Sequence, residues 1–327
     1  MKQAIYETYG NAKDVIKVVE MESQALQDGE ARLQILRTPI NPSDIAQIEG
    51  QYGFQPALPA PAGMEGIGKI VEIQGDGPEV GTLVLLADPP GAWSTEKILS
   101  ISELVAVPHA DINQLSMLCV NPATAYLLLN QYVQLREGDW MIQSAGNSAV
   151  ARYVTQLAKV KGIKVASVVR RESAVGDARA AGADEVFVDG ADLAERVTAR
   201  LPKKPVLAID AVAGETFGRL VATLENGGCA VLYGNMSHSN PSLPDSPLIF
   251  NNVRISGFWL VNWLQSATQE EQSRVYEELT GLILQGHLNA PIDAVFELDQ
   301  IHEALEHTVK GHRSGKVLLA PNGIDIQ

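Results

Sequence analysis

From about residue 110 onward, short apolar runs alternate with segments of helical periodicity. Val150, Val154 and Leu157, for example, fall at positions i, i+4 and i+7, which is one face of an α-helix. Apolar runs bounded by turn residues predict strands, and a strict alternation of strands and helices predicts a doubly wound α/β domain with a six-stranded parallel sheet. The six strands are expected at Trp140–Ser144, Lys164–Val169, Glu185–Val188, Val206–Val212, Cys229–Gly234 and Val253–Leu260.

The first 110 or so residues have a different texture, with short strand-like runs separated by Gly, Pro, Asn and Asp. This pattern predicts a small β-rich domain. Its segment Asn41–Pro61 is long, rich in Pro and Gly and nearly without periodicity, which is typical of a functional loop. A polar helix at Gln269–Gln285 and a closing run Gly315–Leu319 do not continue the alternation, so this tail is assigned to the β-rich domain. The predicted domains are residues 1–120 with 265–327, and residues 121–264.

The composition limits the classes of partner that the protein is expected to bind. The 327 residues carry a formal net charge of −14, which argues against nucleic acid and anionic membranes. No apolar run approaches the roughly 18 residues that a membrane span needs. Cys119 and Cys229 both lie in apolar surroundings, which suggests buried thiols in a reducing compartment. The N-terminus shows neither a signal-peptide core nor a transit segment, and a cytoplasmic location is expected.

The turn after the first strand of the α/β domain is a candidate phosphate-binding turn. Small residues occupy most of it, so backbone N–H groups could approach a pyrophosphate at the helix N-terminus. The helix is capped by Asn147 or Ser148. Two alanines stand where glycines are usual, and the motif is informative mainly through its position. The predicted cofactor-binding residues here are Gly146, Asn147, Ser148 and Val150.

The second strand of this domain ends in Arg170 and Arg171. An acidic residue here would bind the ribose 2′-hydroxyl of NAD and repel a 2′-phosphate. Two guanidinium groups can instead bind that phosphate, and Arg170 follows Gly146 by 24 positions, near the expected spacing of about 20. The sequence therefore predicts NADPH as the cofactor. A solvated charge pair at the start of a helix is the alternative.

Metal catalysis is not expected. Catalytic zinc needs three converging protein ligands, and structural zinc commonly needs four cysteines. The chain has two cysteines, and its six histidines lie outside the candidate loop.

Several motifs carry a resemblance to a known family, namely Ile40–Ile45, Ile48–Gly53, Gly63–Gly66, Asn121–Tyr126, Ala145–Ser148, Val168–Arg170, Ser256–Trp259 with Trp263, and Gly315–Leu319. Together they resemble the zinc-free medium-chain dehydrogenases/reductases, and among these the 2-enoyl thioester reductases, with quinone oxidoreductases next. The resemblance covers nearly the whole chain. It implies a GroES-like catalytic domain joined to a Rossmann domain, and NADPH-dependent reduction of the carbon–carbon double bond of an enoyl-CoA or enoyl-ACP in fatty acid metabolism.

The resemblance also implies residue roles. Tyr52 corresponds to the catalytic tyrosine of the family, whose neutral phenol can donate a proton to Cα after hydride addition at Cβ. Asn41 and Thr124 would position the nicotinamide ribose or the substrate carbonyl. Phe258 and Trp259 would line the nicotinamide and acyl pocket, with Trp259 among the catalytic residues.

Two further residues complete the expected cofactor set, and two other functions stay open. Tyr233 is assigned to cofactor binding, and Lys316 to a cofactor phosphate.

The chain could instead reduce a quinone or enone by direct hydride transfer, or bind NADPH without catalysis. A homodimer is expected, because the strand Val253–Leu260 would lie at a sheet edge and apolar edges are normally covered. The expected partner is a small-molecule substrate, either an acyl thioester or a quinone.

Overall fold

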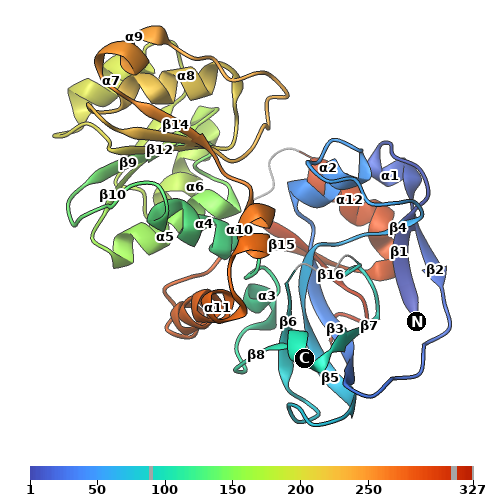
Figure 1. Cartoon of the computed structure of the whole chain (residues 1–327). Coiled ribbons are helices and arrows are strands. Elements are labelled where there is room, and N and C mark those ends of the chain that lie inside the picture. The colour runs from blue at the N-terminus through green and yellow to red at the C-terminus, as the bar shows by residue number, and fades with distance from the viewer. Residues whose placement is uncertain (88–90, 311–314, 326–327) are drawn as a thin grey trace. The chain divides into compact units, whose positions relative to one another are not determined.

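The computed structural model describes residues 1–87, 91–310 and 315–325, which divide into two compact units (Figure 1). Unit 1 comprises Met1–Val120 and Thr268–Gln327, so the tail of the chain belongs with the N-terminal residues. Unit 2 comprises Asn121–Ala267. The boundary falls at Ala267 because a helix at Leu260–Ser266, which has no counterpart in the sequence pattern, belongs to unit 2.

Unit 2 is a doubly wound α/β domain, as the alternating pattern predicts. All neighbouring strands are parallel, in the order β11-β10-β9-β12-β13-β14. This order reverses between β9 and β12, where such sheets bind ligands outside the carboxyl ends of their strands. The strands are β9 Trp140–Gln143, β10 Lys164–Val169, β11 Glu185–Val188, β12 Leu207–Asp210, β13 Cys229–Leu232 and β14 Arg254–Gly257. The helices are α4 Asn121–Asn130, α5 Ala149–Val160, η2 Glu172–Ala174, α6 Val175–Ala180, α7 Leu193–Arg200, α8 Gly214–Thr223, α9 Asp245–Phe250 and α10 Leu260–Ser266.

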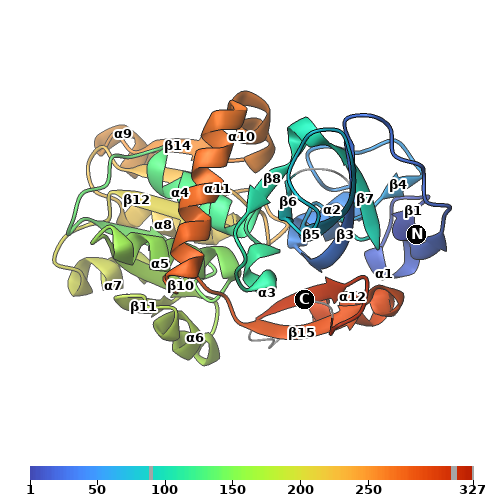
Figure 2. The same cartoon turned by 90° about the horizontal axis from the view of Figure 1, so that it is seen from below.

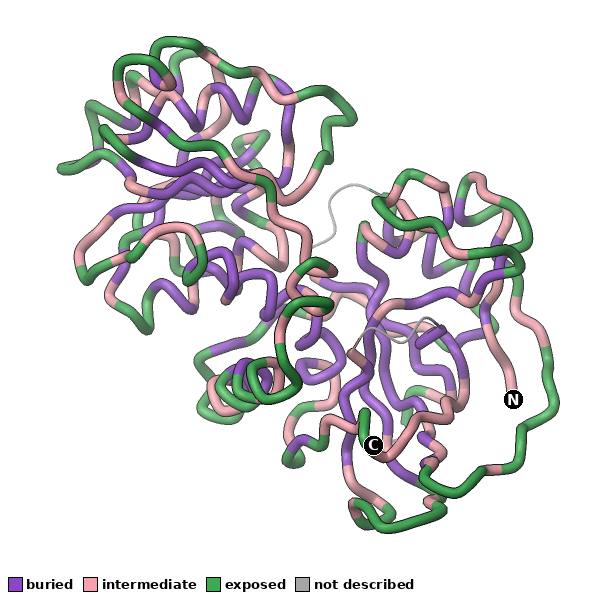
Figure 3. The backbone as a smooth tube through the Cα atoms, viewed as in Figure 1, coloured by how far each residue is buried: buried purple, intermediate pink, exposed green. Residues whose placement is uncertain are grey.

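The core of unit 2 lies on both faces of this sheet, and Figure 3 shows its central strands as buried. Helix α5 buries Val154 and Leu157, which confirms the periodicity read from the sequence. The outermost strand β14 differs, since three of its four residues are exposed, including Ile255. The prediction that this strand lies at a sheet edge is confirmed.

Unit 1 is β-rich and contains two sheets. The larger has the order β15-β16-β3-β5-β6-β8, with β7 also paired to β3, and the smaller has the order β2-β1-β4. The closing strand β16 pairs antiparallel with β3 and so joins the tail to the N-terminal part. The larger sheet contains β3 Glu30–Pro39, β5 Glu65–Gln74, β6 Leu83–Ala87, β7 Glu96–Ser100, β8 Val105–Val107, β15 Ile292–Glu297 and β16 Lys316–Ala320; the smaller contains β1 Lys2–Tyr6, β2 Ile16–Glu20 and β4 Ala60–Pro61.

Helices cover parts of unit 1. The longest, α11, is seen lengthwise in Figure 2 and packs on α3 and β8. Helix α12 packs on α1, β2, β15 and β16, so the C-terminal segment contributes to the core beside the smaller sheet. The helices are α1 Ala12–Val15, α2 Pro42–Ile48, α3 Ile112–Leu115, α11 Gln269–Leu284 and α12 Ile301–Val309, with 3₁₀ turns η1 Ile101–Glu103 and η3 Leu298–Gln300.

Helix α2 corrects the expectation of a segment without regular structure at Asn41–Pro61. Asn41 is its N-cap, Pro42 occupies the first turn, and the Asp44 carboxylate accepts a hydrogen bond from the Asn41 backbone N–H at 2.7 Å. Pro is favoured at this position because the first-turn N–H has no helical partner. The capping signal was present in the sequence, whereas a helix of seven residues is too short to show clear periodicity.

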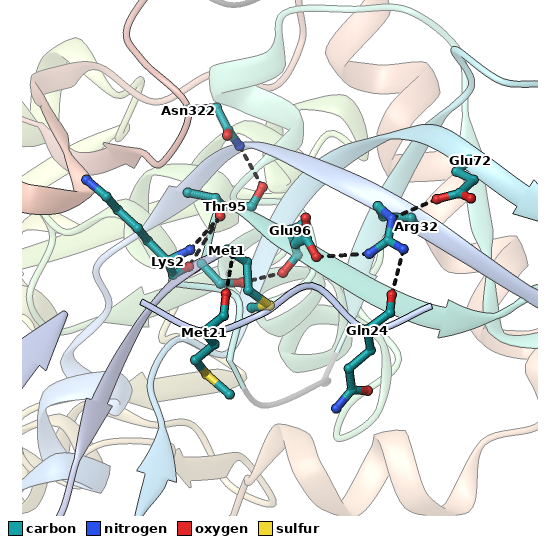
Figure 4. A network of polar contacts seen from close by, with 10 residues as sticks. Met1, Lys2, Met21, Gln24, Arg32, Glu72, Thr95, Glu96 and Asn322 are labelled. Carbon is teal, nitrogen blue, oxygen red and sulfur yellow. Dashed lines mark hydrogen bonds and ion pairs between the residues drawn. The ribbon is translucent and has the colours of Figure 1, made fainter. Parts of the chain in front are cut away.

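Polar contacts hold the strands of the larger sheet at its surface (Figure 4). The Arg32 guanidinium on β3 donates to Glu72 on β5 and to Glu96 on β7, each at 2.9 Å. Its remaining nitrogen donates to the Gln24 carbonyl at 2.7 Å. Because Glu72 is largely exposed, this network adds little to the stability of the fold. Glu96 lies far in sequence from the segment Asn41–Pro61, so its carboxylate is suited to a control substitution.

Candidate functional site

The turn between β9 and α5 lies directly against β10. The Gly146 N–H donates to the Val168 carbonyl at 2.9 Å, and a Cβ atom at Gly146 would stand 2.7 Å from the Cβ of Ser167. Only glycine therefore fits this position without displacing the turn. Ala145 adopts a positive φ of 47°, and Ser148, not Asn147, caps α5 by accepting from the Ala151 N–H. The turn places the capped N-terminus of α5 at the carboxyl edge of the sheet. Backbone N–H groups at a helix N-terminus bind anions, so this geometry is suited to a pyrophosphate.

Two arginines follow β10 at the same edge of the sheet. Arg170 is exposed, and Arg171 is half-buried with a buried Nε that has no hydrogen-bond partner within the described residues. Neither arginine forms an ion pair with any residue that the structure describes. Guanidinium groups without a carboxylate partner are suited to a phosphate.

An acidic residue at the same edge of the sheet, Asp189, is already paired with an arginine. Val169 pairs with Val188, so Asp189 follows β11 at the same end of the sheet as Arg170. Arg219 binds the Asp189 carboxylate through two hydrogen bonds of 2.7 Å, and the Thr216 hydroxyl donates at 2.6 Å. Burial alone would raise the pKa of Asp189, but these donors outweigh burial and lower it. Arg219 thus compensates this carboxylate, and Arg170 and Arg171 stay available to an anion.

Tyr233 follows β13 and reaches the capped turn. Its hydroxyl hydrogen-bonds with the Ser148 side chain, which brings together two residues predicted to contact the cofactor. Burial raises the pKa of Tyr233, so its phenol stays neutral at pH 7. Asp210, at the end of β12, is buried and accepts from the backbone N–H groups of Val212 and Ala213 at 3.1 and 2.6 Å. These contacts order the loops that follow β12 and β13.

The other residues of unit 2 that the sequence assigns to the site lie on different helices and at the end of β14. Val150 lies in the first turn of α5, and Thr124 is buried in α4. Phe258 and Trp259 follow β14 as expected, and the Phe258 N–H donates to the Leu232 carbonyl at 2.9 Å. Trp259 is the N-cap residue of α10, so these aromatic residues stand at a strand-to-helix junction.

In unit 1, a buried polar cluster surrounds the start of α2. The Lys316 ammonium donates to the Asn41 side-chain oxygen at 2.6 Å and to the Ile40 carbonyl at 3.2 Å. The Asn41 side-chain amide donates to the Glu65 carboxylate at 2.7 Å, and Asp44 accepts from the Met64 N–H at 3.0 Å. Burial raises the pKa of Asp44 to about 6 and that of Glu65 to about 7.

Two of the predicted cofactor or substrate contact residues, Asn41 and Lys316, lie in the interior of unit 1. Lys316 is only 6% exposed, and its ammonium donates to Asn41 and Ile40. The oxygen and nitrogen of the Asn41 side chain are both engaged within unit 1. Lys316 lies in this interior because β16, which it opens, pairs with β3.

Tyr52 lies in the loop that follows α2 and is half-buried. The Gln51 N–H donates to the Ala46 carbonyl at 2.8 Å, which ties the residue before Tyr52 to the helix. Further along, the Tyr9 hydroxyl donates to the Pro56 carbonyl at 2.5 Å. The loop is therefore anchored at both ends, and its conformation depends on the position of α2.

Two absences concern only the parts of the chain that the structure describes. No group of three His, Cys, Asp or Glu side chains there could hold a metal ion. No helix there is long and apolar enough to cross a membrane.

Comparisons with known proteins agree with this architecture. The Alcohol dehydrogenase GroES-like domain family matches residues 27–112, and the Zinc-binding dehydrogenase family matches residues 149–279. The mitochondrial enoyl-[acyl-carrier-protein] reductase of Rattus norvegicus is 33% identical over 98% of this chain and 88% of its own length. The Xenopus tropicalis enzyme of the same name is 35% identical over 96% of this chain and 94% of its own length.

Solved structures give the same result. The mitochondrial 2-enoyl thioester reductase Etr1p/Etr2p heterodimer from Candida tropicalis has a TM-score of 0.88 and 27% identity, covering 98% of this chain and 99% of that chain. The Escherichia coli quinone oxidoreductase complexed with NADPH has a TM-score of 0.87 at 22% identity, covering 98% and 100%, and shows the shared fold. A GroES-like unit joined to a six-stranded dinucleotide-binding unit defines the medium-chain dehydrogenase/reductase class. Within that class, the chain belongs to the enoyl-[acyl-carrier-protein] reductase family.

Proposed function

We propose that the protein is an NADPH-dependent reductase of 2-enoyl thioesters. The observation that carries the proposal is the similarity to enoyl-[acyl-carrier-protein] reductases along nearly the whole chain, 33% over 98% of it in the rat enzyme. A solved structure with 26% identity and a TM-score of 0.88 is described as a complex of Etr1p with NADP and crotonyl-CoA. Both support an enoyl thioester as the substrate.

The residues of unit 2 fit NADPH. Gly146 leaves room at the turn where a Cβ would collide with Ser167, and the capped start of α5 suits the pyrophosphate. Arg170 and Arg171 suit the 2′-phosphate, and the buried Arg171 Nε has no described partner. When bound, NADPH supplies a hydride for reduction.

Tyr52 is the proposed proton donor. Reduction of the double bond at Cβ leaves negative charge on the thioester as an enolate, which then needs a proton at Cα. A phenol has a pKa of about 10 and can supply this proton at neutral pH. Thr124, Phe258 and Trp259 are proposed to bind and orient the substrate and nicotinamide. Asn41 is proposed to help position the nicotinamide ribose or the substrate carbonyl, and both ends of its amide are held in place by Glu65 and Lys316.

Turnover of crotonyl-CoA with NADPH tests the proposal. The purified protein is expected to oxidise NADPH when crotonyl-CoA is added, and to yield butyryl-CoA. Activity on a small quinone without activity on crotonyl-CoA would select the quinone reductase alternative. NADPH binding without turnover of either substrate would select the non-catalytic alternative. Comparing crotonyl-CoA with the corresponding acyl-carrier-protein thioester identifies the carrier.

Arg170→Ala is expected to weaken NADPH binding more than NADH binding. We expect the wild type to bind NADPH at least about tenfold more tightly than NADH, which corresponds to about 1.4 kcal/mol. The variant should narrow this ratio, because it removes a guanidinium from the proposed 2′-phosphate site while leaving the Gly146 turn intact. Fluorescence titration with both cofactors measures the ratio, and equal wild-type affinities would contradict the assignment.

We also propose a homodimer and a cytosolic location. The edge strand β14 supports dimerisation, since it is the last strand of its sheet and three of its four residues are exposed. Light scattering at micromolar concentration tests this, and a monomer mass would contradict it. The two cysteines are free and buried, which fits a reducing compartment.

A further inference from the structure

Four polar side chains in the interior of unit 1 form one connected network. Asn41, Asp44, Glu65 and Lys316 are each at most 6% exposed. They come from the start of three elements, namely α2, β5 and β16. Burying ionisable groups is costly, and well-packed apolar residues of similar volume are often at least as stabilising. A network of this kind therefore calls for an explanation other than stability.

The network fixes one side chain completely. Asn41 receives the Lys316 ammonium on its amide oxygen and donates its amide nitrogen to Glu65. Its backbone N–H donates to Asp44. The second Glu65 oxygen accepts a hydrogen bond from the Val120 N–H at 2.8 Å. Val120 directly precedes α4 in the chain. These directional bonds set the N-terminus of α2, from which the Tyr52 loop continues.

We infer that Glu65 and Lys316 are positioning residues that hold Asn41 between them. They thereby fix the segment of residues 41–59, which comprises α2 and the loop that carries Tyr52. The inference deepens the proposed enoyl thioester reductase function and rests on it for its catalytic consequence. Neither residue needs to contact substrate. Their effect passes from Asn41 to α2, and from α2 to Gln51 through the Ala46 carbonyl.

We call the hydrogen bonds by which Glu65 and Lys316 hold Asn41 the clamp. Glu65→Gln tests the clamp with almost no change in the shape of the side chain. A carboxylate accepts from both the Asn41 amide and the Val120 N–H, whereas a glutamine presents an NH₂ group to one of them. Hydrogen-exchange mass spectrometry should show faster exchange in peptides from residues 41–59. The turnover number for crotonyl-CoA should fall about five- to tenfold while NADPH affinity stays within about twofold, since a loop displaced by about 1 Å can lower rates strongly.

Three further variants test whether the effect is specific to these hydrogen bonds. Lys316→Met removes the other end of the clamp and should increase exchange in the same peptides, whereas Lys316→Arg keeps the charge and should restore part of the protection. Glu96→Gln makes the same carboxylate-to-amide change at the Arg32 network and should leave exchange at residues 41–59 unchanged (Figure 4).

A pH profile adds a readout that a purely structural role would not move. The groups facing Glu65 are Lys316, Asp44 and Cys119. Glu65 holds both donors only as a carboxylate, so wild-type turnover should decline as pH falls through about 7. Glu65→Gln should flatten that limb.

The outcomes separate the clamp from the function. Wild-type exchange at residues 41–59 in both Glu65→Gln and Lys316→Met would overturn the clamp, whatever the substrate. Faster exchange with unchanged turnover would overturn its catalytic consequence. A wild type inactive on crotonyl-CoA would instead remove the proposed function, and the exchange data would still decide whether Glu65 and Lys316 fix the loop.

Discussion

Tyr52→Phe is expected to lower the turnover number for crotonyl-CoA by about 10²- to 10⁴-fold, the usual contribution of a positioned general acid. The substitution removes the phenolic hydroxyl and keeps the ring, so the half-buried side chain retains most of its packing. NADPH affinity should change little, because the pyrophosphate turn and the arginines belong to unit 2. Steady-state kinetics with NADPH and crotonyl-CoA measure the effect.

Tyr9→Phe is the matched control. The Tyr9 hydroxyl anchors the same loop by donating to the Pro56 carbonyl, so its loss removes one hydrogen bond, a net loss of about 1 kcal/mol. Turnover should then fall by a few-fold at most. Equal losses in both variants would indicate that the Tyr52 hydroxyl acts by ordering the loop. Unchanged enoyl-CoA reduction in Tyr52→Phe would remove the residue from the mechanism.

The α/β unit could be predicted from sequence because its strands are buried and its helices amphipathic. The predicted strands Lys164–Val169 and Glu185–Val188 coincide with β10 and β11. Helices α9 and α10 were missed for physical reasons: α10 buries none of its residues completely, and α9 buries only Pro247, so neither shows an apolar period. Helix α2 was also missed, because its seven residues are too few to show a clear apolar period and its only sequence signal is the cap in its first turn.

In the candidate site, too, the positions of some residues could be predicted from the sequence and those of others could not. Arg170 and the Gly146 turn could be predicted because both follow strands whose carboxyl ends share one edge. Glu65 and Asp44 were not singled out, and Lys316 was given a different role, because their environment is set by contacts between residues far apart in the chain. Lys316 meets Asn41 across a separation of 275 positions. A charged residue opening a buried strand, as Glu65 does in β5, was the available signal.

Gly146→Ala should weaken NADPH binding by about 5- to 150-fold, which equals the roughly 1–3 kcal/mol that overpacking of a tight site costs. The added Cβ would stand 2.7 Å from the Ser167 Cβ and 3.4 Å from the Val168 carbonyl oxygen, so the turn must move away from β10. Fluorescence titration measures the affinity, and thermal unfolding without cofactor measures how much of the loss is folding stability.

Gly281→Ala in α11 provides the matched control, because a Cβ there meets nothing within 4 Å. An alanine in a helix interior should raise stability by up to about 1 kcal/mol and leave NADPH affinity unchanged. Ser167→Gly should partly rescue Gly146→Ala, since it removes the atoms that the new Cβ meets first. Wild-type NADPH affinity in Gly146→Ala would contradict the assignment of this turn to the pyrophosphate, because a displaced turn could not keep its backbone N–H groups in place.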